Sequence, residues 1–307
     1  MGVLLTLVLM VVGAGVGVES ERRRPKKAVA MARKLLLVML YVLVPPVIFF
    51  NLAAASISVD NGIGIGIALV NMGLVGVVVW LVASQLLQLS PPKTGAVICA
   101  AIVANTTYLG YPLTVALLGR DDLPTGVLFD VLVGGPTLMF GAFGVGAAFG
   151  TRAGEGMRGR VRAFFTRNPP LYAAVLGLLA PKALAPAILV DASQVLAVAI
   201  LPLGFFAVGA TLAEGAEQGE LPLPPPITAP VALATAGRLA LAPALLMLVA
   251  MPLIDLPSAY RLMSAMPTGI NALVVSHAYG LDNRVVAETI TWSTAIVIVG
   301  ALISLLF

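Results

Sequence analysis

Long apolar runs separated by short polar stretches cover almost the whole chain. A helix needs roughly 20 mostly apolar residues to cross the hydrocarbon core of a bilayer. Ten runs approach or reach that length, near residues 1–18, 33–55, 62–89, 94–118, 124–149, 169–189, 191–213, 227–252, 257–279 and 284–306. The pattern therefore predicts an all-α polytopic membrane protein with ten transmembrane helices. The loops between them are too short for a separate soluble domain.

Two of these spans carry polar and helix-breaking residues in their middle. The fourth contains VANTTYLGYPLTV at residues 103–115, and the ninth contains MPTGIN at residues 266–271. A broken helix exposes N–H and C=O groups that hydrocarbon cannot satisfy, so it persists only against protein or a hydrated cavity. Interrupted segments at corresponding places in two halves of a chain point to a transporter site. We therefore expect a binding site where spans four and nine cross.

Short matches between the two halves indicate an internal repeat. Span two contains the pattern P-x-x-F-F at residues 46–50, and span seven contains it again at residues 202–206. Span five opens with LPTGVLFD, ending at Asp130, and span ten opens with LDNRVVAE, ending at Glu288. Five spans per half is an odd number, so the second copy would be inverted in the membrane. The prediction is an inverted 5+5 repeat.

Composition supports the membrane assignment, because 60% of the 307 residues are hydrophobic and only 10% are charged, against about 25% charged in soluble domains. The basic residues gather in loops, chiefly at residues 22–27 and 152–167. Basic loops face the cytoplasm, so both termini are predicted outside it, in a multi-pass protein of the plasma (inner) membrane. The first run lacks the preceding positive charge of a signal peptide and is interpreted as a retained span. The basic balance does not indicate nucleic-acid binding, because no groove-reading pattern accompanies it.

Four segments carry a resemblance to a known family. They are ANTTYLGYPL (104–113), NPPLYAAVLGLL (168–179), LPLGFFAVGATL (201–212) and AMPTGINALVVSHAYGLD (265–282). They resemble segments of the auxin efflux carrier family, whose fold is similar to that of bile-acid sodium symporters. The resemblance implies a scaffold domain at residues 1–55 and 169–213, a transport domain at 62–149 and 227–307, and a cytoplasmic basic loop at 150–168. It also implies a homodimer formed through the scaffold.

The resemblance further implies secondary transport, with efflux as the expected direction, of small organic anions by an elevator mechanism. By matching motif, Asn105 and Pro112 belong to the first crossing segment, and Pro267 and Asn271 to the second. Where the family often has a small residue after its Asn-Thr pair, this chain has Thr107 followed by Tyr108. The full set of predicted substrate-binding residues is Asn105, Thr106, Tyr108, Pro112, Pro267, Asn271 and Arg238.

Ionisable residues within spans are costly in a membrane and are functional candidates by default. Arg238 lies deep in span eight, where its guanidinium could bind a substrate carboxylate or pair with Asp130 or Glu288. Asp130, Glu288 and His277 are candidates for proton coupling. Each also has a structural interpretation, as an interfacial acid, a helix cap or a packed histidine.

Other functions fit the sequence less well. A sodium-coupled organic anion symporter needs several oxygen ligands, usually with a carboxylate near the second crossing, and residues 266–271 include no acid. A channel remains an alternative. The sequence lacks the HExxH, GxSxG, P-loop and CxxC motifs, so an enzyme is not expected. No cofactor is expected, and one histidine with one cysteine cannot build a dedicated metal site.

Overall fold

The computed structural model describes residues 3–152, 168–217 and 224–304, together with residues 159, 162, 165 and 166. The α-helices are α1 (Val3–Arg23), α2 (Lys27–Val38), α3 (Val44–Ala54), α4 (Val59–Leu81), α5 (Pro91–Ile102), α6 (Tyr111–Leu117), α7 (Leu123–Phe129), α8 (Phe143–Phe149), α10 (Pro169–Leu179), α11 (Ala187–Glu217), α12 (Ala229–Ala236), α13 (Ala242–Ala250), α14 (Ser258–Ser264), α15 (Asn271–Tyr279) and α16 (Asn283–Ile303). Shorter π-helical segments are η1 (Met39–Leu43), η2 (Val82–Leu86), η3 (Thr106–Gly110), η5 (Asp130–Gly134), η6 (Thr137–Ala142) and η8 (Gly237–Leu241). Two 3₁₀ turns are η4 (Arg120–Asp122) and η7 (Lys182–Leu184).

Within the described residues, seven helices are long and apolar enough to cross a membrane. They are Val3–Arg23, Lys27–Ala54, Val59–Leu86, Arg120–Phe149, Ala187–Glu217, Ala229–Ala250 and Asn283–Ile303. These match predicted spans one, two, three, five, seven, eight and ten. The all-helical, polytopic prediction is confirmed, whereas ten crossings and the inverted repeat stay predictions.

The predicted bounds of span six, 169–189, are wrong. Helix α10 ends at Leu179, because Pro181 and Pro186 follow and cannot continue a helix. The chain becomes helical again at Ala187, where α11 begins. Several predicted positions lie outside the described residues, namely residues 1, 2, 305 and 306 of the end spans and Arg158, Arg160 and Arg167 of the basic loop.

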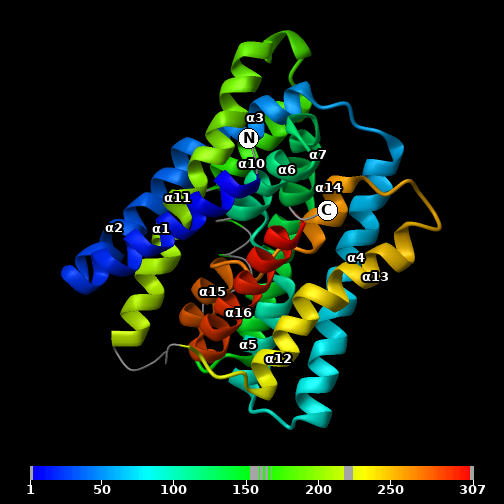
Figure 1. Ribbon diagram of the computed structural model, residues 1–307. Coiled ribbons are helices and arrows are strands. Elements are labelled where there is room, and N and C mark those ends of the chain that lie inside the picture. The colour runs from blue at the N-terminus through cyan, green and yellow to red at the C-terminus, as the bar shows by residue number, and fades with distance from the viewer. Residues whose placement is uncertain are drawn as a thin grey trace.

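The helices form two groups (Figure 1). In one group α11 packs along α1 and α2, and α10 packs on α3; in the other, α5 packs against α4, α12 and α16. Helices α1 and α11 approach closely because glycines line their contact: a Cβ added at Gly17 would lie 2.2 Å from the Phe206 carbonyl oxygen. Small residues permit such close packing of apolar helices.

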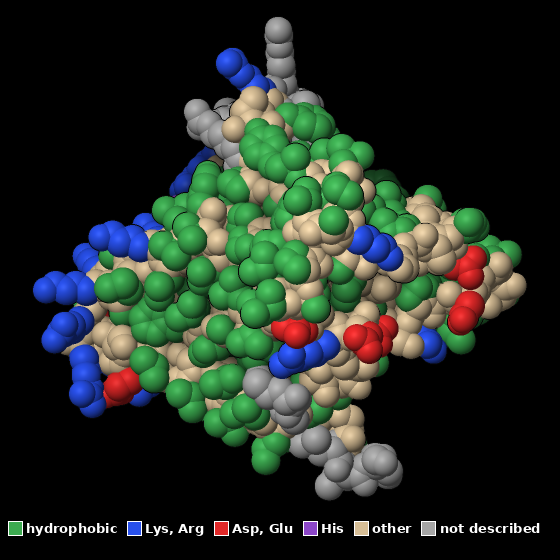
Figure 2. All heavy atoms as spheres, turned by 90° about the horizontal axis from the view of Figure 1, so that it is seen from above, with side chains coloured by type: hydrophobic (Ala, Val, Ile, Leu, Met, Phe, Trp, Pro, Cys, Tyr) green, Lys and Arg blue, Asp and Glu red, His purple; other side chains and the backbone are tan. Residues whose placement is uncertain are grey.

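The surface is rich in apolar side chains. Figure 2 shows them covering much of the visible face, with Lys and Arg side chains gathered toward one edge. Large hydrophobic residues on this surface include Val70, which is 64% exposed, and Leu248, which is 71% exposed. A surface of this kind suits contact with lipid rather than water.

Two helices break at the centre of the molecule. Helix α5 ends at Ile102 and helical structure returns at Thr106, whereas α14 ends at Ser264 and α15 begins at Asn271. The two non-helical stretches run antiparallel: the Asn105 N–H donates to the Pro267 carbonyl (2.8 Å), and the Gly269 N–H donates to the Val103 carbonyl (3.0 Å). A Cβ at Gly269 would lie only 2.8 Å from the Ala104 carbonyl oxygen, so glycine permits this approach.

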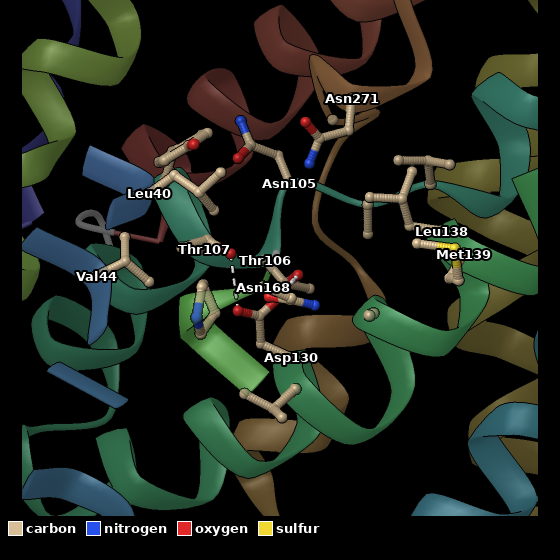
Figure 3. Close-up of a pocket in the computed structure, with 18 of the residues that line it drawn as sticks. Leu40, Val44, Asn105, Thr106, Thr107, Asp130, Leu138, Met139, Asn168 and Asn271 are labelled. Carbon is tan, nitrogen blue, oxygen red and sulfur yellow. Dashed lines mark hydrogen bonds between the residues drawn. The ribbon is translucent and has the colours of Figure 1, made fainter. Parts of the chain in front are cut away.

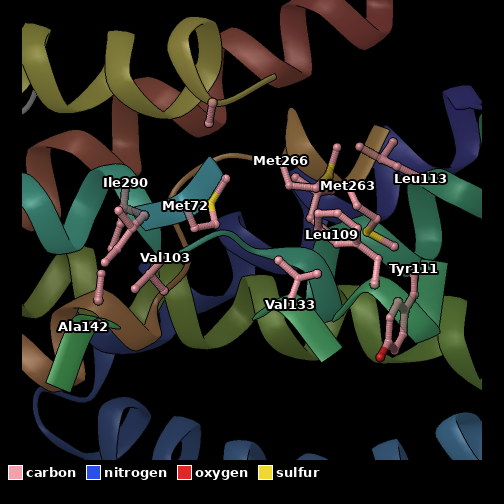
Figure 4. Close-up of a cluster of buried hydrophobic side chains, with 14 of the residues drawn as sticks. Met72, Val103, Leu109, Tyr111, Leu113, Val133, Ala142, Met263, Met266 and Ile290 are labelled. Carbon is pink, nitrogen blue, oxygen red and sulfur yellow. The ribbon is translucent and has the colours of Figure 1, made fainter. Parts of the chain in front are cut away.

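The break in the first segment lies before Pro112, between Ile102 and Thr106. Pro112 is the second residue of α6, a position that tolerates a missing N–H. Around the crossing, apolar side chains such as Val103, Met263 and Met266 fill the interior (Figure 4). The crossing is therefore set in a packed core.

Candidate functional site

A cavity of about 180 Å³ adjoins the crossing. Both non-helical stretches contribute to its wall, as do η5, η6, and the region where η1 and α3 face the start of α10. The lining residues are Leu40, Val44, Ile48, Val103, Ala104, Asn105, Thr106, Thr107, Tyr108, Asp130, Val131, Gly134, Gly135, Leu138, Met139, Asn168, Pro170, Leu171, Gly269, Ile270 and Asn271. The cavity thus combines mostly apolar walls with a few polar groups, as small-molecule sites commonly do.

Asp130 is the centre of a hydroxyl cluster on one side of the cavity. Its Oδ2 accepts hydrogen bonds from Thr107 Oγ1 (2.7 Å) and from the Tyr111 hydroxyl (2.5 Å). Its Oδ1 accepts a hydrogen bond from Thr106 Oγ1. Three donors around one half-buried carboxylate compensate for much of the water that the group has lost.

Two asparagine amides lie on another side of the cavity. Asn105 is 7% exposed, and its side-chain amide makes no hydrogen bond with any other residue that the structure describes. Asn271 is exposed and is the first residue of α15. Figure 3 shows these two amides beside each other, away from the Asp130 carboxylate. A buried amide without a protein partner is free to hydrogen-bond a ligand.

Two helical N-termini also face this region. Helical structure begins at Thr106 after the first break and at Asn271 after the second, and both residues line the cavity. The first N–H groups of a helix have no partner within it and carry partial positive charge. The crossing therefore presents an environment that favours a carboxylate, although the chain contributes no basic side chain to the cavity wall among the lining residues.

The structure does not bring Arg238 into the cavity. Its side chain is 1% exposed and points to the opposite ends of the broken helices: the guanidinium donates to the carbonyls of Ala101 and Ile102 (both 3.3 Å) and of Ser264 (2.5 Å). These are the last residues of α5 and α14. Arg238 therefore caps two helix C-termini, where a cation is favourable, and does not pair with Asp130 or Glu288.

Four predicted substrate-binding residues line the cavity, namely Asn105, Thr106, Tyr108 and Asn271. Pro112 and Pro267 are not among the lining residues, and Pro267 instead accepts the backbone hydrogen bond from Asn105. Of the proton-coupling candidates, Asp130 lines the cavity. Glu288 lies elsewhere, ion-paired with Arg284 at 2.8 Å, and His277 is exposed.

Sequence reasoning missed two features of the site. Thr107 and Tyr111 donate hydrogen bonds to Asp130, and neither was among the predicted site residues. Asn168 also lines the cavity, where its side chain accepts the Leu171 N–H (3.2 Å) and caps α10. The sequence NPP at 168–170 indicates the start of a helix, because an Asn cap followed by proline is typical of that position.

Comparison with known proteins shows similarity to membrane transport proteins. Residues 162–305 match a family model described as membrane transport protein. The chain is 32% identical over 140 residues to an uncharacterized transporter of Methanothermobacter thermautotrophicus, covering 45% of this chain and 44% of that protein. It is 25% identical over 144 residues to an uncharacterized transporter of Methanocaldococcus jannaschii, covering 46% of this chain and 45% of that protein.

The match agrees with the resemblance seen in the sequence: residues 162–305, just under half of the chain, are similar to a family of membrane transport proteins. Each alignment spans less than half the length of the relative. Together with the seven apolar helices, the match identifies a multi-pass membrane protein. Both relatives are named as transporters, the class that the sequence predicted in place of an enzyme.

Proposed function

We propose that the chain is a secondary transporter that binds small organic carboxylates in the cavity at the crossing. The observation that carries this proposal is the buried amide of Asn105, which has no partner among the described residues and lies beside Asn271 and the N-terminus of α15. Amide N–H groups and helix N-termini both donate to carboxylates. The transporter names of the relatives support the same class.

An elevator movement is part of this proposal. One part of the cavity wall, at Val44, Ile48 and Leu171, belongs to the predicted scaffold, and the crossing belongs to the predicted transport domain. A site between two such bodies would gain access to either side of the membrane if one body slid against the other. The domain division, the homodimer, the efflux direction and both termini outside the cytoplasm stay predictions.

Proton coupling also stays a prediction. Among its three candidates, Asp130 has direct access to the ligand, whereas Glu288 and His277 would have to act from outside the cavity. A sodium-coupled symporter and a channel are the competing mechanisms. Uptake that persists without sodium would exclude the first, and saturable uptake with counterflow would exclude the second.

The test is transport by the purified protein in vesicles loaded with small carboxylates, with Asn105→Ala and Asn271→Ala as variants. We expect saturable counterflow in the wild type and at least a tenfold loss of affinity in Asn105→Ala, because one buried hydrogen bond to a charged group contributes about 1.5–3 kcal/mol. Asn283→Ala is the matched control, since Asn283 lies outside the cavity. Equal uptake by all four proteins would refute the site.

A further inference from the structure

The cavity has an unexpected charge distribution for an anion site. Among its lining residues Asp130 is the acidic one, and neither lysine, arginine nor histidine is among them. The deep guanidinium of Arg238 is bound to helix-end carbonyls instead. A simple organic anion would therefore meet a carboxylate and no basic side chain, and like charges repel strongly where water is scarce.

The hydrogen bonds around Asp130 favour its ionised form, whereas its burial favours the neutral acid, so a cationic group in the cavity would stabilise the carboxylate further. Tyr111 is fully buried, and its hydroxyl donates to Asp130 Oδ2 at 2.5 Å, as does Thr107 Oγ1 at 2.7 Å. Donors stabilise a carboxylate more than a neutral acid, because the ionised group accepts at both oxygens. A carboxylate has about four acceptor sites, and three hydroxyl donors leave room for one more donor from the cavity.

The two polar groups of the cavity are separate. Figure 3 shows Asp130, with Asn168 next to it, on one side and the amides of Asn105 and Asn271 on another. The amide side includes the start of α15, a helix of nine residues. It therefore favours negative charge, and the Asp130 side favours positive charge. A ligand that satisfies both sides carries both charges.

We propose that the substrate is a small aliphatic amino acid, bound as a zwitterion. This inference rests on the proposed function and narrows its substrate class. The carboxylate of the ligand accepts from the side-chain amides of Asn105 and Asn271 and lies in the positive field at the start of α15. Its ammonium group donates to Asp130. The side chain of the ligand lies against the apolar wall formed by Val44, Leu138 and Met139. A cavity of about 180 Å³ suits a compact ligand.

The experiment compares ligands with the same carbon skeleton. Binding of 2-aminobutyrate, butyrate and propylamine to the purified wild-type protein is measured by titration calorimetry at neutral pH. We expect 2-aminobutyrate to bind roughly tenfold or more tightly than either partial ligand, since each partial ligand leaves one buried charged or polar group unpaired. This comparison needs no variant, so it does not depend on the folding of a mutant.

Variants then assign the ammonium contact. Asp130→Asn keeps the shape of the side chain and removes its charge, while one accepting oxygen becomes an amide NH2 that donates instead. In this variant the preference for 2-aminobutyrate over butyrate should fall to within about threefold. Asp60→Asn is the control, because Asp60 lies in the first turn of α4 outside the cavity, and it should keep the wild-type preference. In Asn105→Ala, binding of 2-aminobutyrate and butyrate should weaken together.

The outcomes separate this inference from the proposed function. If butyrate binds as tightly as 2-aminobutyrate, or gains affinity as the pH falls, Asp130 takes up a proton rather than contacting an amine, and the inference is wrong while the carboxylate site stands. An amine preference retained in Asp130→Asn also overturns it. If neither carboxylate binds the wild type, both proposals fail.

Discussion

The two faces of the crossing differ in how they satisfy the ends of the broken helices. On one face, the C-termini of α5 and α14 converge on Arg238, which donates to carbonyls of both. On the other face, the N-termini at Thr106 and Asn271 line a cavity beside Asn105. The chain supplies its own cation for the negative ends, whereas the positive ends face the cavity with their dipoles and the Asn105 amide.

This difference assigns separate roles to Arg238 and Asn105, which the sequence grouped together as substrate-binding residues. Arg238 and Thr268 hold the crossing in place: Thr268 is fully buried and donates to the Ala100 carbonyl (2.7 Å), while its N–H donates to Ser293 Oγ (3.1 Å). Asn105 and Asp130 face the cavity instead. Variants on the first face should therefore change stability, and variants on the second should change ligand binding.

The largest expected effect is that of Arg238→Met. Removing the guanidinium leaves carbonyls of α5 and α14 buried without a partner, and breaking a buried charged network costs about 3–5 kcal/mol. We expect a strongly lowered unfolding temperature in detergent, or no folded protein at all. Arg261→Met is the control, because Arg261 is exposed on α14 and bonds only locally, to Ser258. Equal stability of the two variants would show that Arg238 does not hold the crossing.

A smaller effect is expected of Gly269→Ala. Its Cβ would lie 2.8 Å from the Ala104 carbonyl oxygen, so the two non-helical stretches must separate, at a cost of about 1–3 kcal/mol. The unfolding temperature and the ligand affinity should both fall, because the same stretches line the cavity. In Gly66→Ala the added methyl meets nothing within 4 Å, and a gain of stability from better helix propensity is expected there.

Thr268→Val should cost less again. The replacement keeps the shape of the side chain but removes the hydrogen bond to the Ala100 carbonyl, which contributes about 1 kcal/mol. The unfolding temperature should fall while carboxylate affinity stays within about twofold. Thr211→Val is the control, because it removes a hydrogen bond to the Ala207 carbonyl within α11. Its unfolding temperature should fall by less than that of Thr268→Val. A large change of affinity in Thr268→Val would contradict the division of roles.

The smallest effect is expected of His277→Ala. His277 is exposed and lies outside the cavity, so ligand affinity and its dependence on pH should match the wild type. Isothermal titration at two pH values checks this. If ligand affinity depends on pH in the wild type and not in His277→Ala, His277 is a coupling residue. Residues outside the cavity would then also control binding.

Much of the fold was predictable because apolar length and polar interruptions are local signals. The runs that became α1, α4 and α16 could be located from the sequence, and Pro267 and Asn105 marked the crossing. Asn105 and Asn271 both line one cavity, and their role in binding stays a prediction. These signals depend on residues within one segment and on the cost of polar groups in hydrocarbon.

The partners of the charged residues could not be predicted, because they depend on contacts between distant segments. Arg238 donates hydrogen bonds to the Ser264 carbonyl and to two carbonyls at the end of α5. The end of α5 lies at least 136 residues from Arg238 in the sequence. A sequence shows that a buried arginine needs partners, but not whether carbonyls or carboxylates provide them. Likewise, the pairing of Asp130 with Thr106 and Tyr111 depends on how η3 packs against η5.

The central claim is that the cavity at the crossing binds a carboxylate. The most direct measurement is the labelling rate of Leu138→Cys by a small aqueous thiol reagent, with and without 2-aminobutyrate. Leu138 lines the cavity, and the native Cys99 is fully buried and provides the unlabelled background. We predict labelling that slows at least about fivefold with saturating ligand. Labelling that is equally fast without ligand, with saturating 2-aminobutyrate and with saturating butyrate would contradict the account.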